Sequence, residues 1–492
     1  MKLKIRNLDW LAGRPVVFLN EKTAKKLNIF VNKRVELKGT KKVQAVVDIF
    51  SKVVGKKEIG LSKELTKILE MKDNSLVDIR PTEISKAAFL IKKKMQGKEL
   101  TKQEIDLIIS EIVHNNLTDA EIAYFTAAEK LRKMSMKETI NLTKAMVKTG
   151  AKLKFNGKII ADKHCIGGVA GNRTTPIIIS ICAAAGLTIP KTSSRAITSA
   201  AGTSDVIEVV AKVELSLKRI KDVVRKTGAC MVWGGSLGLA PSDDKIIRVE
   251  RLLNLDIEAQ LLASILSKKL SAGSKYIIID IPYGKNSKIP SLKKAKRLKR
   301  NFEKIAKHFK LKLKVLLTDG RKPVGNGFGP VLEMHDIIKV LKNYPDAPTD
   351  LKEKSLFLST ELLKLCKLKN ARKKAEDILY SGKAYEKFKE IVNAQNQKKN
   401  FEKIYESLAT AKFKKTIKAR KSGTIKEISN KGINSICRMV GTPETITAGA
   451  YLHKKSGIIK KGEKLLTIYA ENKQKLKTAI KFYKEFKPII IK

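Results

Sequence analysis

Short β-rich runs separated by turn signals characterise the beginning of the chain. Two examples are residues 16–19, with the sequence VVFL, and residues 43–47, with the sequence VQAVV. Such runs are typical of strands that are bounded by turns. The pattern predicts a small β-rich N-terminal domain over residues 1–84.

The apolar positions then change to a helical spacing. One predicted helix places four isoleucines on a single face, and Asp119 opens the next helix. The four are Ile105, Ile108, Ile109 and Ile112. We therefore expect a helical domain over residues 85–158, joined by part of residues 240–270.

Nearly continuous apolar runs alternate with helical patterns in the next stretch. Residues 276–281 and 313–317 are predicted strands, and residues 216–227 are a predicted helix. Strands with apolar residues on both faces are typical of a parallel sheet that helices cover on both sides. This pattern predicts an α/β domain over residues 159–411, with a mostly parallel sheet.

Residues 412–492 read as a small C-terminal α/β domain with turn signals at Gly457 and Gly462. The expected fold class is thus α/β and multidomain. It combines a helical domain and a parallel-sheet domain with one small domain at each end.

A glycine loop opens onto a predicted helix inside the α/β domain. Residues 158–160 are taken as the end of a strand, the loop carries the sequence ADKHCIGGVAGN over 161–172, and a buried helix follows over 176–183. Glycines let backbone N–H groups approach an anion, and a helix N-terminus favours negative charge. Lys163, Thr174 and Thr175 add donors, which favours a phosphate site. The alternative is an ordinary turn between a strand and a helix.

A second loop, at residues 192–204, holds seven Ser and Thr residues in thirteen positions. Asp205 and Glu208 follow it and are expected to cap a helix. Apolar residues flank the loop on both sides, which favours a ligand-binding loop over a polar surface loop.

The net charge of +54 raises the question of nucleic-acid binding. The lysines are scattered along every segment, and aromatic residues make up only 5% of the chain, so stacking surfaces are few. We expect no specific nucleic-acid binding, but only weak association with RNA that salt weakens.

Five widely spaced cysteines do not form a disulfide or zinc pattern. No apolar run approaches the length of a membrane span, about 18 residues. The sequence therefore predicts a soluble cytoplasmic protein with no metal and no membrane partner.

Several separated motifs resemble those of the thymidine and pyrimidine nucleoside phosphorylase family, above all its archaeal AMP phosphorylase branch. Besides the two loops, the motifs are LAPSD at 239–243, LASILSKK at 262–269, TDGRKPVGNG at 318–327 and GAYLH at 449–453. The pyrimidine enzymes of the family lack the N-terminal domain. The resemblance implies a pentosyltransferase that converts AMP, or other nucleoside 5′-monophosphates, and phosphate into free base and ribose 1,5-bisphosphate.

The resemblance also implies the ligands and their residues. Phosphate is a co-substrate, no further cofactor is expected, and the assembly is a homodimer or a larger homo-oligomer. Lys163, Thr174 and Ser193 match phosphate-binding positions, and Thr203 could touch both ligands. The AMP-contacting positions are Gly168, Ser194, Arg195, Ala196, Ile197, Thr198, Ser199, Thr203, Ser264 and Lys288.

Departure of adenine requires a proton donor, and Asp256 matches the catalytic acid of AMP phosphorylases. From the residues alone, Asp256 could instead cap the following helix. Ser264 and Lys268 are four residues apart and share a helix face. By the resemblance, Ser264 contacts the nucleotide and Lys268 matches a base-contacting lysine of the pyrimidine enzymes. Without the resemblance, Lys268 and Lys269 would be read as a solvated helix end.

Cys165 stands where the family usually has a serine that binds phosphate, and a thiol is a weak donor. His164 matches a histidine near the base in the pyrimidine enzymes, and its role toward adenine stays open. The alternatives for function are a thymidine or pyrimidine nucleoside phosphorylase, an RNA-binding protein and an enzyme related to anthranilate transferase.

Overall fold

A computed structural model of the chain describes residues 1–82, 85–155, 159–196, 199–253, 255–397 and 400–492. Its contacts divide the chain into two compact units. The first unit contains Met1–Thr149 and Ala240–Ser264, and the second contains Gly150–Leu239 and Ile265–Lys492. The domain boundaries at residues 84, 158 and 411 stay predictions.

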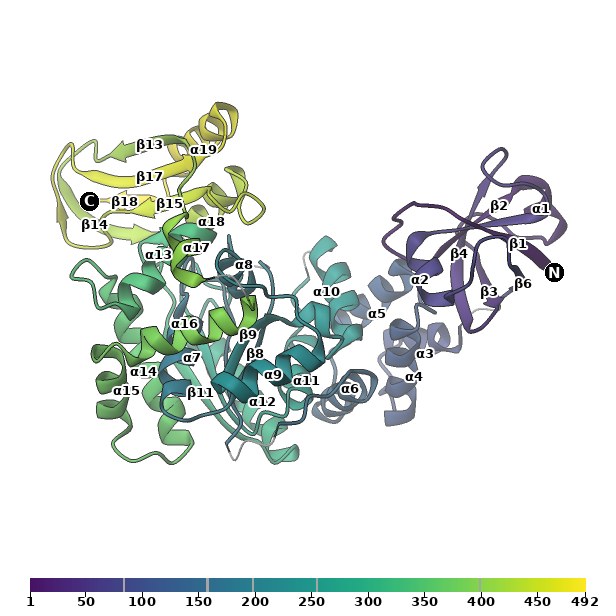
Figure 1. Ribbon diagram of the computed structural model, residues 1–492, viewed down its shortest axis with the longest axis horizontal. Coiled ribbons are helices and arrows are strands. Elements are labelled where there is room, and N and C mark those ends of the chain that lie inside the picture. Colours follow the sequence, from purple (N-terminus) through teal and green to yellow (C-terminus); the bar gives the residue numbers. More distant parts are fainter. Residues whose placement is uncertain (83–84, 156–158, 197–198, 254, 398–399) are drawn as a thin grey trace. The chain divides into compact units, whose positions relative to one another are not determined.

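Six strands of the first unit close into a barrel with the order β1-β5-β2-β4-β3-β6 (Figure 1). Its interior is apolar, because alternate residues of strands such as β1 and β3 are buried. The predicted strands at 16–19 and 43–47 lie in β2 and β4, so both are confirmed. The elements are β1 (Lys2–Asn7), β2 (Val16–Asn20), α1 (Glu21–Lys26), β3 (Arg34–Lys38), β4 (Lys42–Phe50), β5 (Glu58–Leu61), α2 (Lys63–Leu69) and β6 (Leu76–Pro81).

Helices make up the rest of the first unit. The four isoleucines predicted to share a face of α4 are all fully buried. Capping boxes at Thr101 and Thr118 begin α4 and α5, which satisfies backbone N–H groups that lack partners within a helix. The helices are α3 (Lys86–Met95), α4 (Lys102–Val113), α5 (Asp119–Arg132), α6 (Met136–Thr149), α10 (Pro241–Leu252) and α11 (Glu258–Ser271), whose last turns belong to the second unit.

The second unit is built around parallel strands. β7 (Ala161–Cys165), β10 (Tyr276–Tyr283) and β11 (Lys312–Asp319) form a sheet with the order β11-β10-β7. β8 (Ile189–Ser193) pairs in parallel with β9 (Ala229–Trp233), and a parallel bridge from Ile160 to Thr188 joins the two sheets. The strands predicted at 276–281 and 313–317 are confirmed.

The strand before the glycine loop differs from its prediction. We expected it to end at residue 160, but β7 begins at Ala161 and runs to Cys165. The sequence of β7 is polar, so apolar runs could not predict its position. Asp162 and Lys163 are nevertheless buried, because charged and hydroxyl groups of neighbouring elements surround them.

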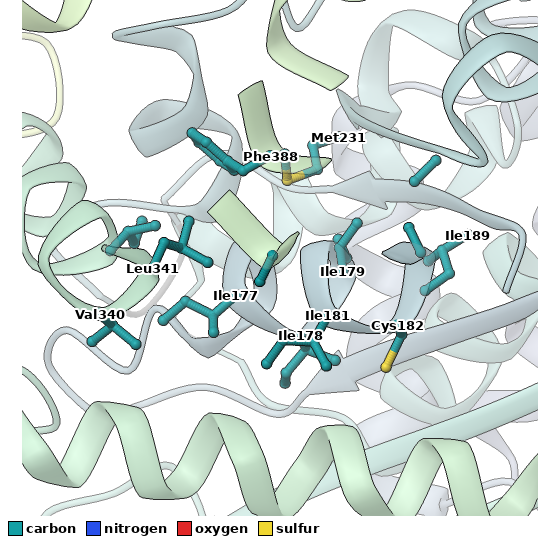
Figure 2. Close-up of a cluster of buried hydrophobic side chains, with 14 of the residues drawn as sticks. Ile177, Ile178, Ile179, Ile181, Cys182, Ile189, Met231, Val340, Leu341 and Phe388 are labelled. Carbon is teal, nitrogen blue, oxygen red and sulfur yellow. The ribbon is translucent and has the colours of Figure 1, made fainter. Parts of the chain in front are cut away.

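A large apolar core holds the helices of the second unit to these strands. α7 is buried from Thr174 to Ala183, as expected for a helix that is apolar on all sides. Figure 2 shows its isoleucines gathered with Met231 of β9, Leu341 of α13 and Phe388 of α16. The helices are α7 (Thr174–Ala184), α8 (Thr203–Glu208), α9 (Leu217–Thr227), α12 (Leu292–His308), α13 (Pro330–Leu341), α14 (Thr349–Leu365), α15 (Ala371–Tyr380), α16 (Lys383–Asn396) and α17 (Phe401–Glu406), with the 3₁₀ helix η1 (Gly234–Leu237).

The last part of the chain has antiparallel strands and its own apolar cluster. Two sheets have the orders β12-β15-β17-β13 and β16-β14-β18 (Figure 1). The elements are β12 (Gly327–Phe328), β13 (Phe413–Lys418), β14 (Gly423–Ile428), α18 (Asn430–Met439), β15 (Gly449–Leu452), β16 (Ile458–Ile459), β17 (Lys464–Ala470), α19 (Lys473–Phe486) and β18 (Ile489–Ile491). The chain is thus multidomain, with a helical part and an α/β part. Among the described residues, no helix has the length and apolar character that a membrane crossing requires.

Candidate active site

Both loops predicted to bind ligands follow the carboxyl ends of parallel strands. The glycine loop follows β7, and the hydroxyl-rich loop follows β8. Parallel sheets bind ligands at this edge, because loops from several strands meet there. The structure therefore places the two loops where a ligand site is expected.

Lys163 occupies the centre of the predicted phosphate cradle. Its Nζ lies 3.0 Å from Thr174 Oγ1 and 3.2 Å from Thr175 Oγ1, at the start of α7. Burial lowers the pKa of Lys163 although Cys165 and Asp280 act in the opposite direction. A bound phosphate would restore the stability of its positive charge, so this cluster is suited to an anion.

Asp280 lies beside this cradle and was not predicted. It is fully buried in β10, where its carboxylate accepts hydrogen bonds from Thr318 Oγ1 at 2.6 Å and Cys165 Sγ at 3.3 Å. Lys354 Nζ lies 3.1 Å from it. Burial acts to raise the pKa of Asp280, but Lys354, Lys163 and the Thr318 hydroxyl outweigh it and lower the pKa. Asp280 is thus a carboxylate that orients groups around the cradle.

Arg173 joins the two loops. Its Nε donates to Glu333 Oε2 at 2.6 Å, one terminal nitrogen donates to Thr203 Oγ1 at 3.1 Å, and the other to the carbonyl of Ala201 at 2.7 Å. Arg173 and Glu333 are both buried. A buried guanidinium with this many partners fixes geometry, since its planar fork leaves little freedom. We call this group of contacts the Arg173 clasp.

Asp205 shapes the hydroxyl-rich loop. Its Oδ2 accepts hydrogen bonds from the backbone N–H of Ala196 at 2.8 Å and of Gly202 at 2.7 Å. The capping role predicted for Asp205 is therefore confirmed. The prediction for Glu208 is wrong, because Glu208 ends α8 and pairs with Arg195.

The side chain of Arg195 is already engaged. It pairs with Glu208 and with Glu214 at 3.0 Å, and it stacks over Trp233 at 4.8 Å from the ring centre. These partners raise its pKa, with the Glu208 hydrogen bond as the largest cause. The guanidinium of Arg195 is thus held by partners within the protein.

Two predicted AMP positions, Gly168 and Lys288, lie against each other. A Cβ atom at Gly168 would lie 2.3 Å from the backbone nitrogen of Lys288, so only glycine fits. Gly202 is similar, since a Cβ there would lie 2.5 Å from the carbonyl carbon of Arg195. Because glycine has no side chain, the backbone can approach its neighbours this closely at Gly168 and Gly202.

One helix of the C-terminal part contacts both loops. Asn430 of α18 accepts from the backbone N–H of Ala170 at 3.0 Å, and Asn434, one turn later, accepts from Ala200 at 3.1 Å. Neither asparagine was predicted. Together with the Arg173 clasp, they hold the glycine loop and the hydroxyl-rich loop as one unit.

A buried ionic group borders the cradle. Asp162 pairs with Lys269 at 2.6 Å and with Lys191 at 3.3 Å. Lys269 is therefore buried and paired, so the alternative of a solvated helix end does not apply to it. Burial lowers the pKa of Lys191, with Asp162 opposing the shift. Burial and the nearby Lys269 and Lys191 also lower the pKa of His164 well below 6.5, so its imidazole is neutral near pH 7.

Three predicted serines lie at the end of β8 and in the hydroxyl-rich loop that follows it. Ser193 is half-buried at the end of β8, and its Oγ is buried without a hydrogen bond among the described residues. Ser194 and Ser199 belong to the hydroxyl-rich loop, where Ser199 Oγ donates to the carbonyl of Ala201 at 2.6 Å. Ile197 and Thr198 lie outside the described residues.

Asp256 and Ser264 belong to the first unit. The side chain of Asp256 is exposed, two residues before α11, and its backbone carbonyl accepts from Lys130 Nζ at 2.9 Å. Ser264 donates to Asp243 Oδ2 at 2.8 Å. Over the described part of the chain, no group of three or more His, Cys, Asp or Glu side chains is arranged to hold a metal ion.

Comparisons with known proteins identify the family. The family description "Glycosyl transferase family, helical bundle domain" matches residues 89–150, and "Glycosyl transferase family, a/b domain" matches residues 157–260. Solved structures of two anthranilate phosphoribosyltransferases share the fold. The enzyme from Thermus thermophilus has a TM-score of 0.51 at 16% identity and covers 62% of this chain and 98% of its own. The enzyme from Saccharomyces cerevisiae has a TM-score of 0.52 at 14% identity, with coverages of 64% and 99%.

Archaeal relatives match over the full length of the chain. The AMP phosphorylase of Thermococcus kodakarensis is 41% identical over 100% of this chain and 98% of its own length. Those of Pyrococcus furiosus and Methanocaldococcus jannaschii are each 40% identical, over 100% and 99% of this chain and 98% and 97% of their own lengths. The chain therefore belongs to the AMP phosphorylase family.

Proposed function

We propose that the protein catalyses the phosphorolysis of AMP, giving adenine and ribose 1,5-bisphosphate. The observation that carries this proposal is the Arg173 clasp, which ties a cationic loop to a hydroxyl-rich loop at one edge of the sheet. A phosphorolytic site must hold phosphate and the nucleotide together, so that phosphate can displace the base from C1′ of the sugar. The full-length match to AMP phosphorylases supports the same reaction.

The cradle is the proposed phosphate site. Lys163 supplies a buried positive charge, and Thr174 supplies a hydroxyl group 3.0 Å from its Nζ. Ser193 is proposed as a further phosphate contact by its match to the family, and its buried hydroxyl has no hydrogen bond among the described residues. Thr203 receives a hydrogen bond from Arg173 and stands next to both ligands in this proposal. Oriented donors of this kind stabilise the charge of a phosphate as its oxygen approaches C1′.

The hydroxyl-rich loop, Gly168, Lys288 and Ser264 are the proposed AMP contacts. The close packing of Gly168 on Lys288 supports a shared role for these two positions. Lys288 would add a positive charge for the 5′-phosphate, while loop hydroxyls and backbone groups would bind the ribose.

Asp256 is the proposed catalytic acid, assigned by its match to the family. A departing adenine must receive a proton, and a carboxylic acid can provide it near neutral pH only where its surroundings favour the protonated form. Because Asp256 is exposed in this structure, the nucleotide-bound site would have to supply those surroundings.

A pyrimidine nucleoside phosphorylase is not favoured. The sequence AITSA at 196–200 stands where those enzymes have a loop with glycine and histidine, and the full-length relatives are AMP phosphorylases. We propose further that phosphate is the sole additional substrate and that no other cofactor takes part. The enzyme would work in the cytoplasm as a homodimer or larger homo-oligomer.

A substrate panel tests the proposal. Purified protein is incubated with phosphate and, in separate reactions, AMP, CMP, UMP, thymidine or uridine, and the released base is separated by chromatography. We expect adenine from AMP only when phosphate is present. Release of base from the unphosphorylated nucleosides alone would refute the assignment.

A further inference from the structure

The second unit contains a cavity of about 650 Å³ beside β11. Thr318 and Asp319 at the carboxyl end of β11 line it, together with the start of α14 and Lys455. Its volume lies within the range of about 300–1,000 Å³ that is usual for small-molecule sites. It is therefore large enough for a metabolite rather than a single ion.

Positive charge predominates among the groups that line this cavity. Lys322 and Lys354 both line it. Of the carboxylates in the lining, Asp350 is paired with Lys455 at 2.6 Å, and Asp319 is paired with Arg321 at 2.8 Å. These pairings neutralise the two acids. An anion entering the cavity would therefore meet Lys322, and it would share Lys354 with Asp280, which lies 3.1 Å from the Lys354 Nζ.

Hydrogen-bond donors add to this charge. α14 begins at Thr349 and has 17 residues, and its first residues line the cavity. The N-terminus of a helix of this length presents backbone N–H groups and a partial positive charge. Thr349 and Asn326 supply polar groups that suit the hydroxyls of a sugar. The Thr318 hydroxyl donates to Asp280 and can accept a hydrogen bond from a sugar hydroxyl.

The cavity is separate from the phosphate cradle. Lys163, Thr174 and Thr203 do not line it. The backbone of Val324 lies between the two, because it lines the cavity and is hydrogen-bonded to Ala170 and Asn172 of the glycine loop. Lys354 nevertheless connects them, since it lines the cavity and lies 3.1 Å from Asp280 at the edge of the cradle.

We infer that this cavity binds a sugar phosphate, at a second site distinct from the one that carries out phosphorolysis. The phosphate group lies between Lys322 and Lys354 at the start of α14, and the sugar hydroxyls contact Thr318 and Asn326.

Ribose 5-phosphate is the probe for calorimetric titration, at 0.15 M salt to suppress binding to scattered lysines. Lys322→Glu removes a cation from the cavity without touching the cradle, and Lys322 is exposed, so the variant should fold. Lys307→Glu, at an exposed position on α12, is the matched control for the charge change. Ribose and inorganic phosphate are titrated separately.

The wild type and Lys307→Glu should bind ribose 5-phosphate equally, and Lys322→Glu should bind about tenfold more weakly because it loses a charge-assisted contact. AMP phosphorolysis without added sugar phosphate should be unchanged in both variants. Equal affinity in Lys322→Glu would place the binding elsewhere and overturn the inference. Inorganic phosphate that binds through Lys322 as tightly as ribose 5-phosphate would overturn the assignment to a sugar phosphate.

Discussion

At the scale of single residues, the site depends on charged side chains that are buried and paired. Lys163, Arg173 and Asp280 each lie in the interior, where an unpaired charge would be costly. Each therefore has several polar partners, which include Thr174 at the start of α7, Thr203 of the hydroxyl-rich loop and Cys165 at the end of β7. The same contacts that stabilise the charges also position the donors that a phosphate would use.

Asp256→Asn tests the proposed acid. We expect turnover of AMP to fall about 100-fold or more, because the amide cannot donate a proton as a carboxylic acid does. AMP affinity and the circular dichroism spectrum should remain those of the wild type. Asp222→Asn, on α9, is the control. A turnover near the wild-type value would remove Asp256 from the mechanism.

Cys165→Ser tests the departure from the family pattern. The thiol donates weakly to Asp280 and accepts from Asn172 Nδ2 at 3.3 Å. A hydroxyl is a stronger donor, so we expect the KM for phosphate to fall about threefold to tenfold with little change in kcat. Cys182→Ser, in the core of α7, should leave this KM unchanged. An unaltered phosphate KM in Cys165→Ser would mean that the thiol plays no part.

Only some of these residues could be recognised from the sequence. Lys163 and Thr174 stand beside glycines at the start of a helix, a local pattern that points to an anion. Arg173 and Lys269 carry no such signal in a chain with 102 Lys and Arg residues. Asp280 did carry a recognisable sequence signal, since a carboxylate within an apolar strand must be buried and paired.

At the scale of elements, the Arg173 clasp tests whether the two loops act together. Arg173→Lys keeps a charge near Glu333 but cannot also reach Thr203 and Ala201. We expect kcat/KM to fall about tenfold, with higher KM values for both AMP and phosphate, because both loops lose their alignment. Arg225→Lys, on the exposed side of α9, is the control. Wild-type KM values in Arg173→Lys would show that the clasp does not position the ligands.

A second prediction concerns Glu129 on α5. Both its carboxylate oxygens are buried without a hydrogen bond among the described residues. Burial, then the nearby Glu250 and also Glu138, raise its pKa well above 4.5. Since folding raises this pKa, the folded state holds a proton that the unfolded state releases, and stability is lost as the pH rises through the folded value.

Glu129→Leu should therefore raise the melting temperature by about 2–4 °C at pH 8, with a smaller gain at pH 5. Thermal unfolding at the two pH values measures this difference. Glu99→Leu, at an exposed position of the same unit, should have little effect. A lower melting temperature at pH 8 would mean that Glu129 stabilises the helices as a carboxylate.

Elements with strong periodicity were predictable, and polar ones were not. α4 and β10 follow from their apolar spacing. β7 was displaced in the prediction because Asp162, Lys163 and His164 interrupt the apolar pattern. Asp162 is buried because it pairs with Lys269, which is far along the chain. Asn430 and Asn434 were missed for the same reason, since their contacts lie more than 200 residues away.

At the scale of the whole molecule, the net charge of +54 does not by itself define a function. Many lysines lie on exposed helix faces, such as those of α12, while the ones that define the cradle are buried. The sequence predicted a helical part and an α/β part, and the comparisons match those two kinds of domain. The architecture depends on long apolar patterns, which is why it was easier to predict than the site.

The central claim is that a phosphate oxygen attacks C1′ of AMP. Phosphate labelled with ¹⁸O at all four oxygens tests it directly, with mass spectrometry of the sugar product and measurement of the released adenine. We predict equal amounts of adenine and ribose 1,5-bisphosphate, with all four labelled oxygens in the phosphate at C1. Adenine released together with unlabelled ribose 5-phosphate would mean hydrolysis by water and would contradict the account.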